Sequence, residues 1–241
     1  MIRKITFAPG EYYHVYNRGV EKRDIFTSEE DRKRFQRLLY LCNGEKPIIY
    51  RLVQGPTLYS KDMGKKMTAV GAYVLMPNHF HVLLKETKEG GITEFMRKLT
   101  TGYTMYFNKK YDRVGHLFQG IFKAQHVSRD EYLKYLFAYI HLNPVKSVDP
   151  DWEKKRVRDH EKAKAYLKGY QYSSYTDLIG KKRPEGAILG SKEFPGYFNS
   201  KVEFEDLVDE WMNYEEEESG RPASRDESEE GENLMAQFLA E

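Results

Sequence analysis

The sequence has very little cysteine and no long apolar stretch. Cys42 is the one cysteine among 241 residues, which excludes an internal disulfide and a metal site built from several cysteines. No run of 18 apolar residues occurs, so no membrane-spanning helix is expected. The first residues, MIRKITFAPGEYYHVYNRG, also lack the apolar segment of a secretory signal. We therefore expect a cytoplasmic protein with no membrane association.

Charge is distributed unevenly along the chain, although the net value is only +2. Residues 203–241 contain 15 Asp and Glu residues against Arg221 and Arg225, so this segment carries a charge of about −13 and residues 1–202 carry about +15. Such a basic body favours a polyanionic partner, and nucleic acid is the obvious class. The alternative is that the basic residues only keep the surface soluble, and the charge favours nucleic acid over this alternative.

Hydrophobic periodicity and turn residues predict alternating strands and helices. In chain order we expect strand 12–19, helix 27–43, strand 69–76, strand 79–86, helix 90–111, extended segment 115–127 and helix 128–143. Thr27 or Ser28 can cap the first helix, while Ser128 and Glu131 form a capping-box pattern at the last one, which Pro144 ends. The order β-α-β-β-α-β-α predicts an α+β fold, with a ferredoxin-like antiparallel sheet and helices packed on it.

We expect three parts in the chain. Residues 1–180 form the main domain, and residues 181–213 form a C-terminal helical extension. Residues 214–241 are poor in apolar residues and rich in charge of one sign, which predicts an acidic, disordered tail.

Two histidines lie one residue apart in the stretch YVLMPNHFHVLL, residues 73–84. Because side chains alternate along a strand, His79 and His81 share one face, and Phe80, Val82 and Leu84 share the other. We take the apolar face as the core face, so the histidines are expected to look out from the sheet side by side. That spacing suits a single metal ion. Strand histidines more often bond to a neighbour, so the pair alone does not establish a metal site.

The helix predicted over 128–143 carries tyrosines at helical spacing. Tyr132, Tyr135 and Tyr139 share a face, and Asn143 follows Tyr139 by one turn. One interpretation is amphipathic packing. The other is that Tyr139 is a nucleophile beside a metal ion to which Asn143 gives an oxygen ligand. A phenol with an ordinary pKa near 10 needs a metal that polarises the scissile group, and periodicity does not decide between these interpretations.

Several motifs together resemble the single-tyrosine HUH transposases, in the branch called REP-associated tyrosine transposases. LMPNHFHVLLK resembles the HUH motif, in which a hydrophobic residue separates two histidines. GHLFQGIFKA and YIHLNPV resemble the segments that follow it in that branch. YYHVYNRGVEKRDIF and YQYSSYTDLIG resemble its N-terminal segment and the element after its last core helix. The resemblance covers about residues 10–180, in the family's order.

This resemblance implies an enzyme that cuts and rejoins single-stranded DNA next to hairpins formed by palindromic repeats. It implies Tyr139 as the nucleophile, which forms a covalent 5′-phosphotyrosine link and releases a 3′-OH. It also implies a divalent cation, Mg²⁺ or Mn²⁺, held by His79, His81 and Asn143, and no nucleotide cofactor. Members of the wider family act as homodimers or as monomers, and the sequence leaves both open.

Basic residues interleaved with aromatic rings suit a groove for single-stranded DNA, because charge tracks phosphates and rings stack on bases. The candidates for nucleic-acid binding are Arg18, Lys22, Arg23, Lys109, Lys110, Arg113 and Lys123. The sequence departs from the family's pattern at Ile121, where an arginine is common, in the longer segment 44–68, and in the acidic tail.

Two further functions remain open at this point. One is a catalytically idle DNA-hairpin-binding protein or repressor on the same fold. The other is a metal-dependent nuclease that uses activated water and does not need Tyr139. Covalent trapping of DNA on the protein separates the transposase from both.

Overall fold

The computed structural model describes residues 5–213, except residues 48, 51, 52, 54, 56, 153–155 and 199. It contains one four-stranded antiparallel sheet in the order β2-β3-β1-β4. The strands are β1 (Tyr12–Arg18), β2 (Thr68–Met76), β3 (His79–Glu86) and β4 (Lys123–Val127). This order, with a helix after β1 and another after β3, is the ferredoxin-like arrangement and confirms the predicted fold class. The predicted tail, residues 214–241, lies outside the described residues.

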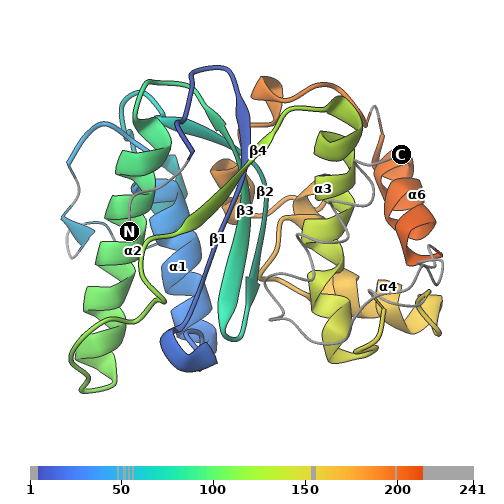
Figure 1. Cartoon of the computed structure of the whole chain (residues 1–241), viewed down its shortest axis with the longest axis horizontal. Coiled ribbons are helices and arrows are strands. Elements are labelled where there is room, and N and C mark those ends of the chain that lie inside the picture. The colour runs from blue at the N-terminus through green and yellow to red at the C-terminus, as the bar shows by residue number, and fades with distance from the viewer. Residues whose placement is uncertain are drawn as a thin grey trace.

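Helices cover both faces of the sheet (Figure 1). The described α-helices are α1 (Glu29–Leu41), α2 (Gly91–Lys110), α3 (Asp130–Leu142), α4 (His160–Gly169), α5 (Tyr175–Leu178) and α6 (Lys201–Met212). The described 3₁₀ helices are η1 (Val20–Lys22), η3 (Leu58–Ser60), η4 (Asn143–Ser147), η5 (Pro184–Ile188) and η6 (Ser191–Glu193). In Figure 1, α1 and α2 lie on one side of the sheet, and α3, α4 and α6 lie on the other.

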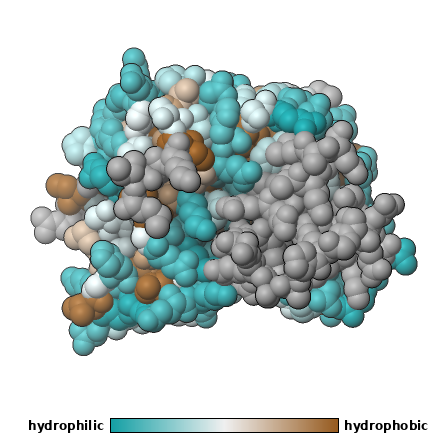
Figure 2. All heavy atoms as spheres, viewed as in Figure 1, coloured by the Kyte–Doolittle hydropathy of each residue, from teal (hydrophilic) through white to brown (hydrophobic). Residues whose placement is uncertain are grey.

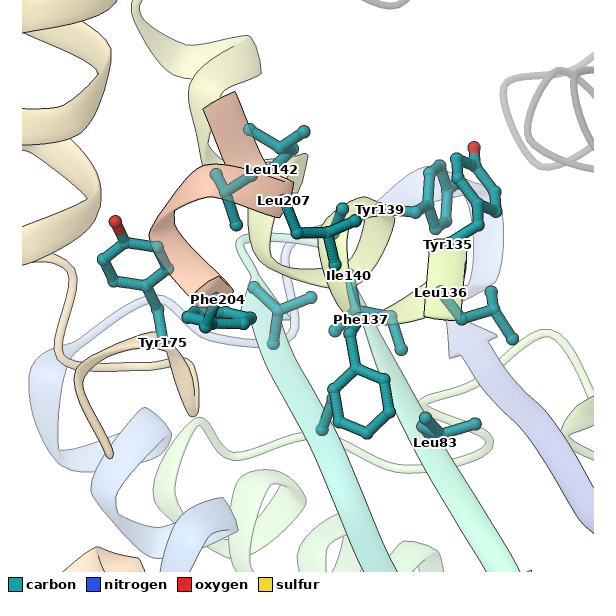
Figure 3. Close-up of a cluster of buried hydrophobic side chains, with 14 of the residues drawn as sticks. Leu83, Tyr135, Leu136, Phe137, Tyr139, Ile140, Leu142, Tyr175, Phe204 and Leu207 are labelled. Atoms are coloured by element: carbon teal, nitrogen blue, oxygen red, sulfur yellow. The ribbon is translucent and has the colours of Figure 1, made fainter. Parts of the chain in front are cut away.

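The two faces of the sheet bury separate apolar clusters, because side chains alternate along each strand. Phe80, Val82 and Leu84 belong to the cluster under α1 and α2, as the alternation predicted. Leu83 and its neighbours on the opposite face belong to the cluster formed with α3 and α6. Figure 3 shows Leu83 with side chains of α3 and α6 gathered in this second cluster. The extension 181–213 therefore adds apolar packing to α3, whereas the boundary at residue 180 stays a prediction.

The predicted N-terminal cap is confirmed for α1 and is wrong for α3. Ser28 is the N-cap of α1 and forms a capping box with Asp31. The predicted capping box of Ser128 is wrong, because α3 begins one residue later than that motif requires and its N-cap, Arg129, makes no side-chain cap bond. Helix α3 ends at Leu142, and the chain continues as the 3₁₀ helix η4 with Pro144 near its start.

The extended segment predicted over 115–127 forms a strand only over its last five residues, which pair with β1. Gly115 and Gly120 have φ angles of 88° and 107°, a region that favours glycine and turns the chain out of a strand. The turn brings residues 119 and 120 to the end of β1, where the Gln119 amide donates to the Arg18 carbonyl at 2.9 Å and the Asn17 side chain donates to the Gly120 carbonyl at 3.2 Å.

The outer edge of β2 is covered by a later segment of the chain. The Leu75 amide donates to the Tyr172 carbonyl at 2.9 Å, and the Ser174 amide donates to the Tyr73 carbonyl at 3.0 Å. Covering an edge in this way satisfies backbone groups that would otherwise invite pairing with another chain.

The described surface is mostly polar on the face seen in Figure 2, where apolar side chains appear only in small separate areas. The large hydrophobic side chains that are exposed are Ile49, Met105, Val114, Ile121 and Val202. Within the described part of the chain, no helix has the length and apolar character needed to cross a membrane.

Candidate active site and metal centre

The two histidines of the HUH stretch lie between the sheet and α3. In the register of β1 and β3, His81 is opposite Tyr16 and His79 is opposite Arg18, so these four side chains share one face. The predicted common face of the histidines is confirmed. The expectation that they look out from the sheet is wrong, because α3 covers this face and His81 is only 8% exposed.

Four residues singled out from the sequence are brought together here. The ring centroids of His79 and His81 are 5.1 Å apart, with the ring planes nearly perpendicular. The Tyr139 ring stands edge-on to His81 at 5.8 Å, and Asn143 lies within hydrogen-bonding reach of His79. The structure thus gathers Tyr139, His79, His81 and Asn143 within one chain, while their chemical roles stay predictions.

The tyrosine face of α3 also has the predicted arrangement. The rings of Tyr132 and Tyr135 are 6.1 Å apart, and those of Tyr135 and Tyr139 are 5.7 Å apart. Figure 3 shows Tyr135 and Tyr139 side by side at the edge of the apolar cluster. Tyr139 is the member of this row that lies beside the histidines.

Hydrogen bonds determine which atom of each candidate ligand can still bind a cation. His79 Nδ1 lies 2.6 Å from Asn78 Oδ1, and the Asn78 amide is oriented by donating to the Lys22 carbonyl at 3.2 Å. Because Asn78 Oδ1 can only accept, His79 carries its proton on Nδ1 and has its lone pair on Nε2. The Asn143 amide nitrogen donates to the Tyr139 carbonyl at 2.9 Å, which leaves the Asn143 oxygen, the atom within reach of His79, as the donor atom for a cation.

His81 is held through its Nδ1 as well, but by another histidine. His14 Nε2 lies 2.9 Å from His81 Nδ1, so Nε2 is the nitrogen of His81 that remains for a ligand. The candidate donor set therefore consists of two imidazole Nε2 atoms and one amide oxygen.

Burial keeps these imidazoles neutral. Desolvation lowers the pKa of His79 to about 3, and the positive charges of Arg18 and Lys146 act in the same direction, whereas the bond with Asn143 opposes them. Burial also lowers the pKa of His81 well below its usual value, with further contributions from the neighbouring histidines and from Lys146 and Arg18. A neutral imidazole is the form that binds metal.

The donor set fits a divalent cation that keeps positions for phosphate oxygens and water. Two neutral nitrogens and one amide oxygen bring no negative charge of their own, so a phosphate can supply it, and such a mixed set suits Mn²⁺ or Mg²⁺ in use. Among the described residues, no group of three or more His, Cys, Asp or Glu side chains is arranged to hold a metal ion.

Some of the predicted DNA-binding residues lie close to this site. Arg18 is near enough that its charge lowers the pKa of His79 and of His81, and Lys146, which was not among the predicted residues, acts on both in the same direction. The Lys123 ammonium lies 5.9 Å from the centre of the Tyr16 ring, on the histidine face of the sheet. Lys22 is exposed, beside the Asn78 turn.

Arg23 and the basic residues after α2 are placed differently. Arg23 forms an ion pair with Glu21 at 2.7 Å. Lys110 Nζ lies 2.7 Å from the buried carboxylate of Asp31 and 2.8 Å from Ser28 Oγ, so it joins the end of α2 to the start of α1. Arg113 donates to the Asn108 side chain at 3.0 Å, and Lys109 is exposed at the same end of α2.

Three residues near the site were not singled out for it from the sequence. Asn78 was assigned only to a turn, although it directly precedes the first histidine. His14 recurs in the resembling N-terminal segment without an assigned role, and the strand alternation that places it with Tyr16 is its signal. Lys146 follows Asn143 by three residues, a helical spacing.

His141 was expected to be structural, and its ring nitrogens lie 2.6 Å from the Phe137 carbonyl and 2.7 Å from Ser174 Oγ.

Comparison with known protein structures gives weak likenesses over most of the chain. A REP-associated tyrosine transposase bound to a REP hairpin has 11% sequence identity and a TM-score of 0.45, over 77% of this chain and 90% of that chain. The tRNA(His) guanylyltransferase from Saccharomyces cerevisiae has 13% identity and a TM-score of 0.35, over 92% of this chain and 85% of that chain. At these scores neither likeness supports an argument about function. Comparison with curated proteins gave no match.

The sequence itself matches a family. Residues 57–143 match the model of the family described as "Transposase IS200 like". This segment runs from before β2 to Asn143, so it includes both histidines and Tyr139. The match agrees with the resemblance to transposases drawn from the motifs, and over residues 57–143 the chain is similar to the IS200-like transposase family.

Proposed function

We propose that this protein cleaves and rejoins single-stranded DNA next to hairpins, as a member of the REP-associated tyrosine transposase branch. The observation that carries the proposal is the contact of Tyr139 with His81, whose rings stand edge-on at 5.8 Å. The Tyr139 ring therefore lies beside a candidate cation ligand, and a nucleophile for a phosphodiester is needed near such a ligand. The hairpin partner follows from the motif resemblance.

In the proposed reaction, the Tyr139 oxygen attacks the phosphorus of a DNA phosphodiester. A bond from phosphorus to tyrosine oxygen forms, and the bond to the 3′-oxygen of the preceding nucleotide breaks. The phenol proton leaves, the 3′-oxygen gains a proton, and the 5′-phosphate stays on Tyr139. A second 3′-OH then reverses the exchange, so no nucleotide cofactor is required. A cation held by His79, His81 and Asn143 would polarise the phosphate.

Residues of the chain contribute electrostatics to this step. Arg18 and Lys146 bring positive charge to the neighbourhood of both histidines. The phosphodiester is anionic, and negative charge builds up in its transition state. Cations fixed beside the site therefore stabilise the transition state more than the ground state.

The decisive experiment is covalent trapping. Labelled single-stranded hairpin oligonucleotides are incubated with the protein and Mn²⁺, and the products are separated on a denaturing gel. The wild type should form a gel-stable adduct, and Tyr139→Phe should lose both cleavage and adduct while retaining fold and DNA binding. Tyr135→Phe is the matched control, since its ring lies 5.7 Å from that of Tyr139 on the same helix face, and it should keep the adduct.

Other outcomes identify the other functions. An adduct that persists in Tyr139→Phe transfers the role of nucleophile to another tyrosine, with Tyr135 the first suspect. Hairpin binding with no cleavage by the wild type indicates an idle binding protein or repressor. Cleavage without any adduct, unchanged in Tyr139→Phe, indicates a nuclease that uses water.

The cation has its own test in the same assay. Excess EDTA should abolish cleavage, and His79→Ala and His81→Ala should each do so in the presence of Mn²⁺, because each removes one of two imidazole ligands. Undiminished cleavage in EDTA would exclude the metal-dependent step.

Mixing variants tests whether one chain is sufficient. Because Tyr139 contacts His81 of the same chain, we propose that a monomer holds the complete site. A mixture of Tyr139→Phe and His81→Ala should then remain inactive. Restored cleavage in the mixture would mean that two chains exchange tyrosines in a homodimer.

A further inference from the structure

His14 is a buried histidine of β1 that the proposed reaction does not use. It is 2% exposed, and its ring lies nearly parallel to that of His81, with centroids 5.0 Å apart and an interplanar angle of 17°. His14 Nε2 is 2.9 Å from His81 Nδ1. Its own Nδ1 has no hydrogen-bond partner among the described residues. One nitrogen of the His14 ring is thus hydrogen-bonded to a candidate cation ligand.

The partners of the two candidate histidine ligands differ in kind. Asn78 offers an oxygen that can only accept, so His79 must keep its proton on Nδ1. A histidine can donate or accept at the same nitrogen, so the bond between His14 and His81 has two possible proton positions. With the proton on His81 Nδ1, the lone pair of His81 lies on Nε2. With the proton on His14 Nε2, His81 carries its own proton on Nε2 and cannot bind a cation there.

The charges around the site favour the first arrangement. Arg18 and Lys146 are close enough to act on His81. Positive charge near the neutral His81 ring favours a lone pair rather than an N–H on Nε2, the nitrogen that does not bond to His14. In this arrangement His14 carries its proton on Nδ1, which has no hydrogen-bond partner among the described residues, so the charges that act on His81 must outweigh the cost of one unpaired N–H.

We propose that His14 is a positioning residue that accepts the Nδ1 proton of His81 and so keeps the His81 Nε2 lone pair available for a divalent cation. The inference rests on the proposed function for the identity of the ligands. In this inference His14 does for His81 what Asn78 does for His79. Each partner fixes the orientation of the ring and the position of its proton before the cation binds. Partners of this kind commonly change metal affinity about 10- to 100-fold when they are removed.

Two variants separate this role from simple packing. His14→Gln supplies an oxygen that can accept from His81 Nδ1, as Asn78 does for His79. His14→Phe retains a ring of similar size but has no acceptor. Mn²⁺ affinity is measured by isothermal titration calorimetry without DNA, thermal unfolding checks the fold, and long-range ¹H–¹⁵N correlation of the metal-free protein reports which nitrogen of His81 carries the proton.

Positioning predicts a loss of Mn²⁺ affinity of about 10- to 100-fold in His14→Phe and near-wild-type affinity in His14→Gln. The spectrum should show His81 protonated on Nδ1 in the wild type and in His14→Gln, and a mixture of both forms in His14→Phe. Packing alone predicts the reverse order of affinities. Wild-type Mn²⁺ affinity in His14→Phe would overturn the proposal. A spectrum of the wild type that places the His81 proton on Nε2 would also overturn it, and this second test does not need His14→Phe to fold.

The proposed function can fail separately. If the wild type and His79→Ala both bind no Mn²⁺, the cation site of the proposed function is absent, whereas the wild-type spectrum still decides the proton position in the bond between His14 and His81. If the wild type binds Mn²⁺, His79→Ala does not, and His14→Phe matches the wild type, only the inference about His14 is overturned.

Discussion

The side chain of Asn143 donates a hydrogen bond to the backbone carbonyl of Tyr139 at 2.9 Å. Carbonyl groups in the last turn of a helix have no amide partner within the helix, and Asn143 supplies one at the end of α3. The same bond turns the Asn143 oxygen away from that carbonyl. The proposed nucleophile and the proposed oxygen ligand are therefore fixed relative to each other by one side-chain contact.

Asn143→Asp should separate the structural role of this residue from ligand binding. A carboxylate cannot donate to the Tyr139 carbonyl, and the loss of this buried hydrogen bond should lower the free energy of unfolding by about 0.5–1.5 kcal/mol. The new charge should also bind Mn²⁺ more tightly than the neutral amide does. Urea unfolding with and without Mn²⁺ should show lower stability without the ion and a larger gain on adding it than in the wild type. Equal stability of both proteins in both conditions would contradict this.

Folding stability should fall in mild acid because of His14. Burial lowers the pKa of His14 to about 3, while an unfolded histidine has a pKa of about 6.5. Below pH 6.5 the unfolded chain therefore binds a proton that the folded protein excludes, so stability is complete above this pH and declines as the pH falls toward 3. For this group alone the loss at pH 5 is about 2 kcal/mol.

His14→Gln is the control for that decline. The variant should show a shallower fall in the free energy of unfolding between pH 7.5 and pH 5, measured by urea denaturation at each pH. His141 is also buried, with its pKa lowered to about 4, and contributes the same sign in both proteins. Parallel pH curves for the two proteins would show that His14 is not the source.

Lys110 should behave as a structural residue rather than as a DNA contact. Its ammonium pairs with Asp31, whose side chain is fully buried. Lys110→Gln should therefore lower the free energy of unfolding by about 1–3 kcal/mol, because a buried acceptor loses its charged partner. The adjacent and exposed Lys109 is the matched control, and Lys109→Gln should change stability by no more than about 0.5 kcal/mol. Equal stability of both variants in urea would return Lys110 to the list of DNA contacts.

Lys110 also shows where sequence reasoning reaches its limit. Alternation along HFHVLL was enough to place both histidines on one face, and helical spacing was enough to place Asn143 after Tyr139. A basic residue among aromatic rings, however, has the same pattern in a DNA groove and in an anchor between helices. Only the fold reveals Asp31, which is 79 residues away from Lys110.

The partner of His81 was beyond sequence reasoning for a related reason. His14 and His81 are 67 residues apart and meet because β1 pairs with β3. Strand order and register depend on tertiary packing, which one sequence does not disclose. The covering of the histidine face by α3 has the same origin, since local alternation marks only one face of a strand as apolar.

Lys146 should contribute to DNA cleavage through its charge. It lies near enough to lower the pKa of both His79 and His81, at the place where a phosphate would approach. Lys146→Gln should weaken single-stranded DNA binding and reduce the magnitude of the slope of log affinity against log salt by about 0.7, the value for one phosphate contact. Lys146→Arg keeps the charge and should retain that slope. Fluorescence anisotropy over a salt series measures it, and identical slopes for Lys146→Gln and the wild type would remove Lys146 from the interface.

The acidic tail should compete with DNA. Helix α6 ends at Met212, and the Trp211 ring lies 4.3 Å from Tyr135, which in turn lies 5.7 Å from Tyr139. The described chain thus ends close to the tyrosine face of α3. Residues 203–241 carry about −13 against about +15 in residues 1–202, and a polyanion tethered near a basic groove competes with another polyanion for it.

Truncation after residue 213 should therefore tighten single-stranded DNA binding and steepen its salt dependence, because the freed body neutralises more phosphates and displaces more counterions. A full-length variant with glutamines at residues 215–218 is the matched control, since it keeps the length of the tail and removes part of its charge. It should lie between the wild type and the truncated protein in both affinity and slope. If all three proteins bind with equal affinity and equal salt slope, the tail has no part in DNA binding and acts only as a solubilising segment.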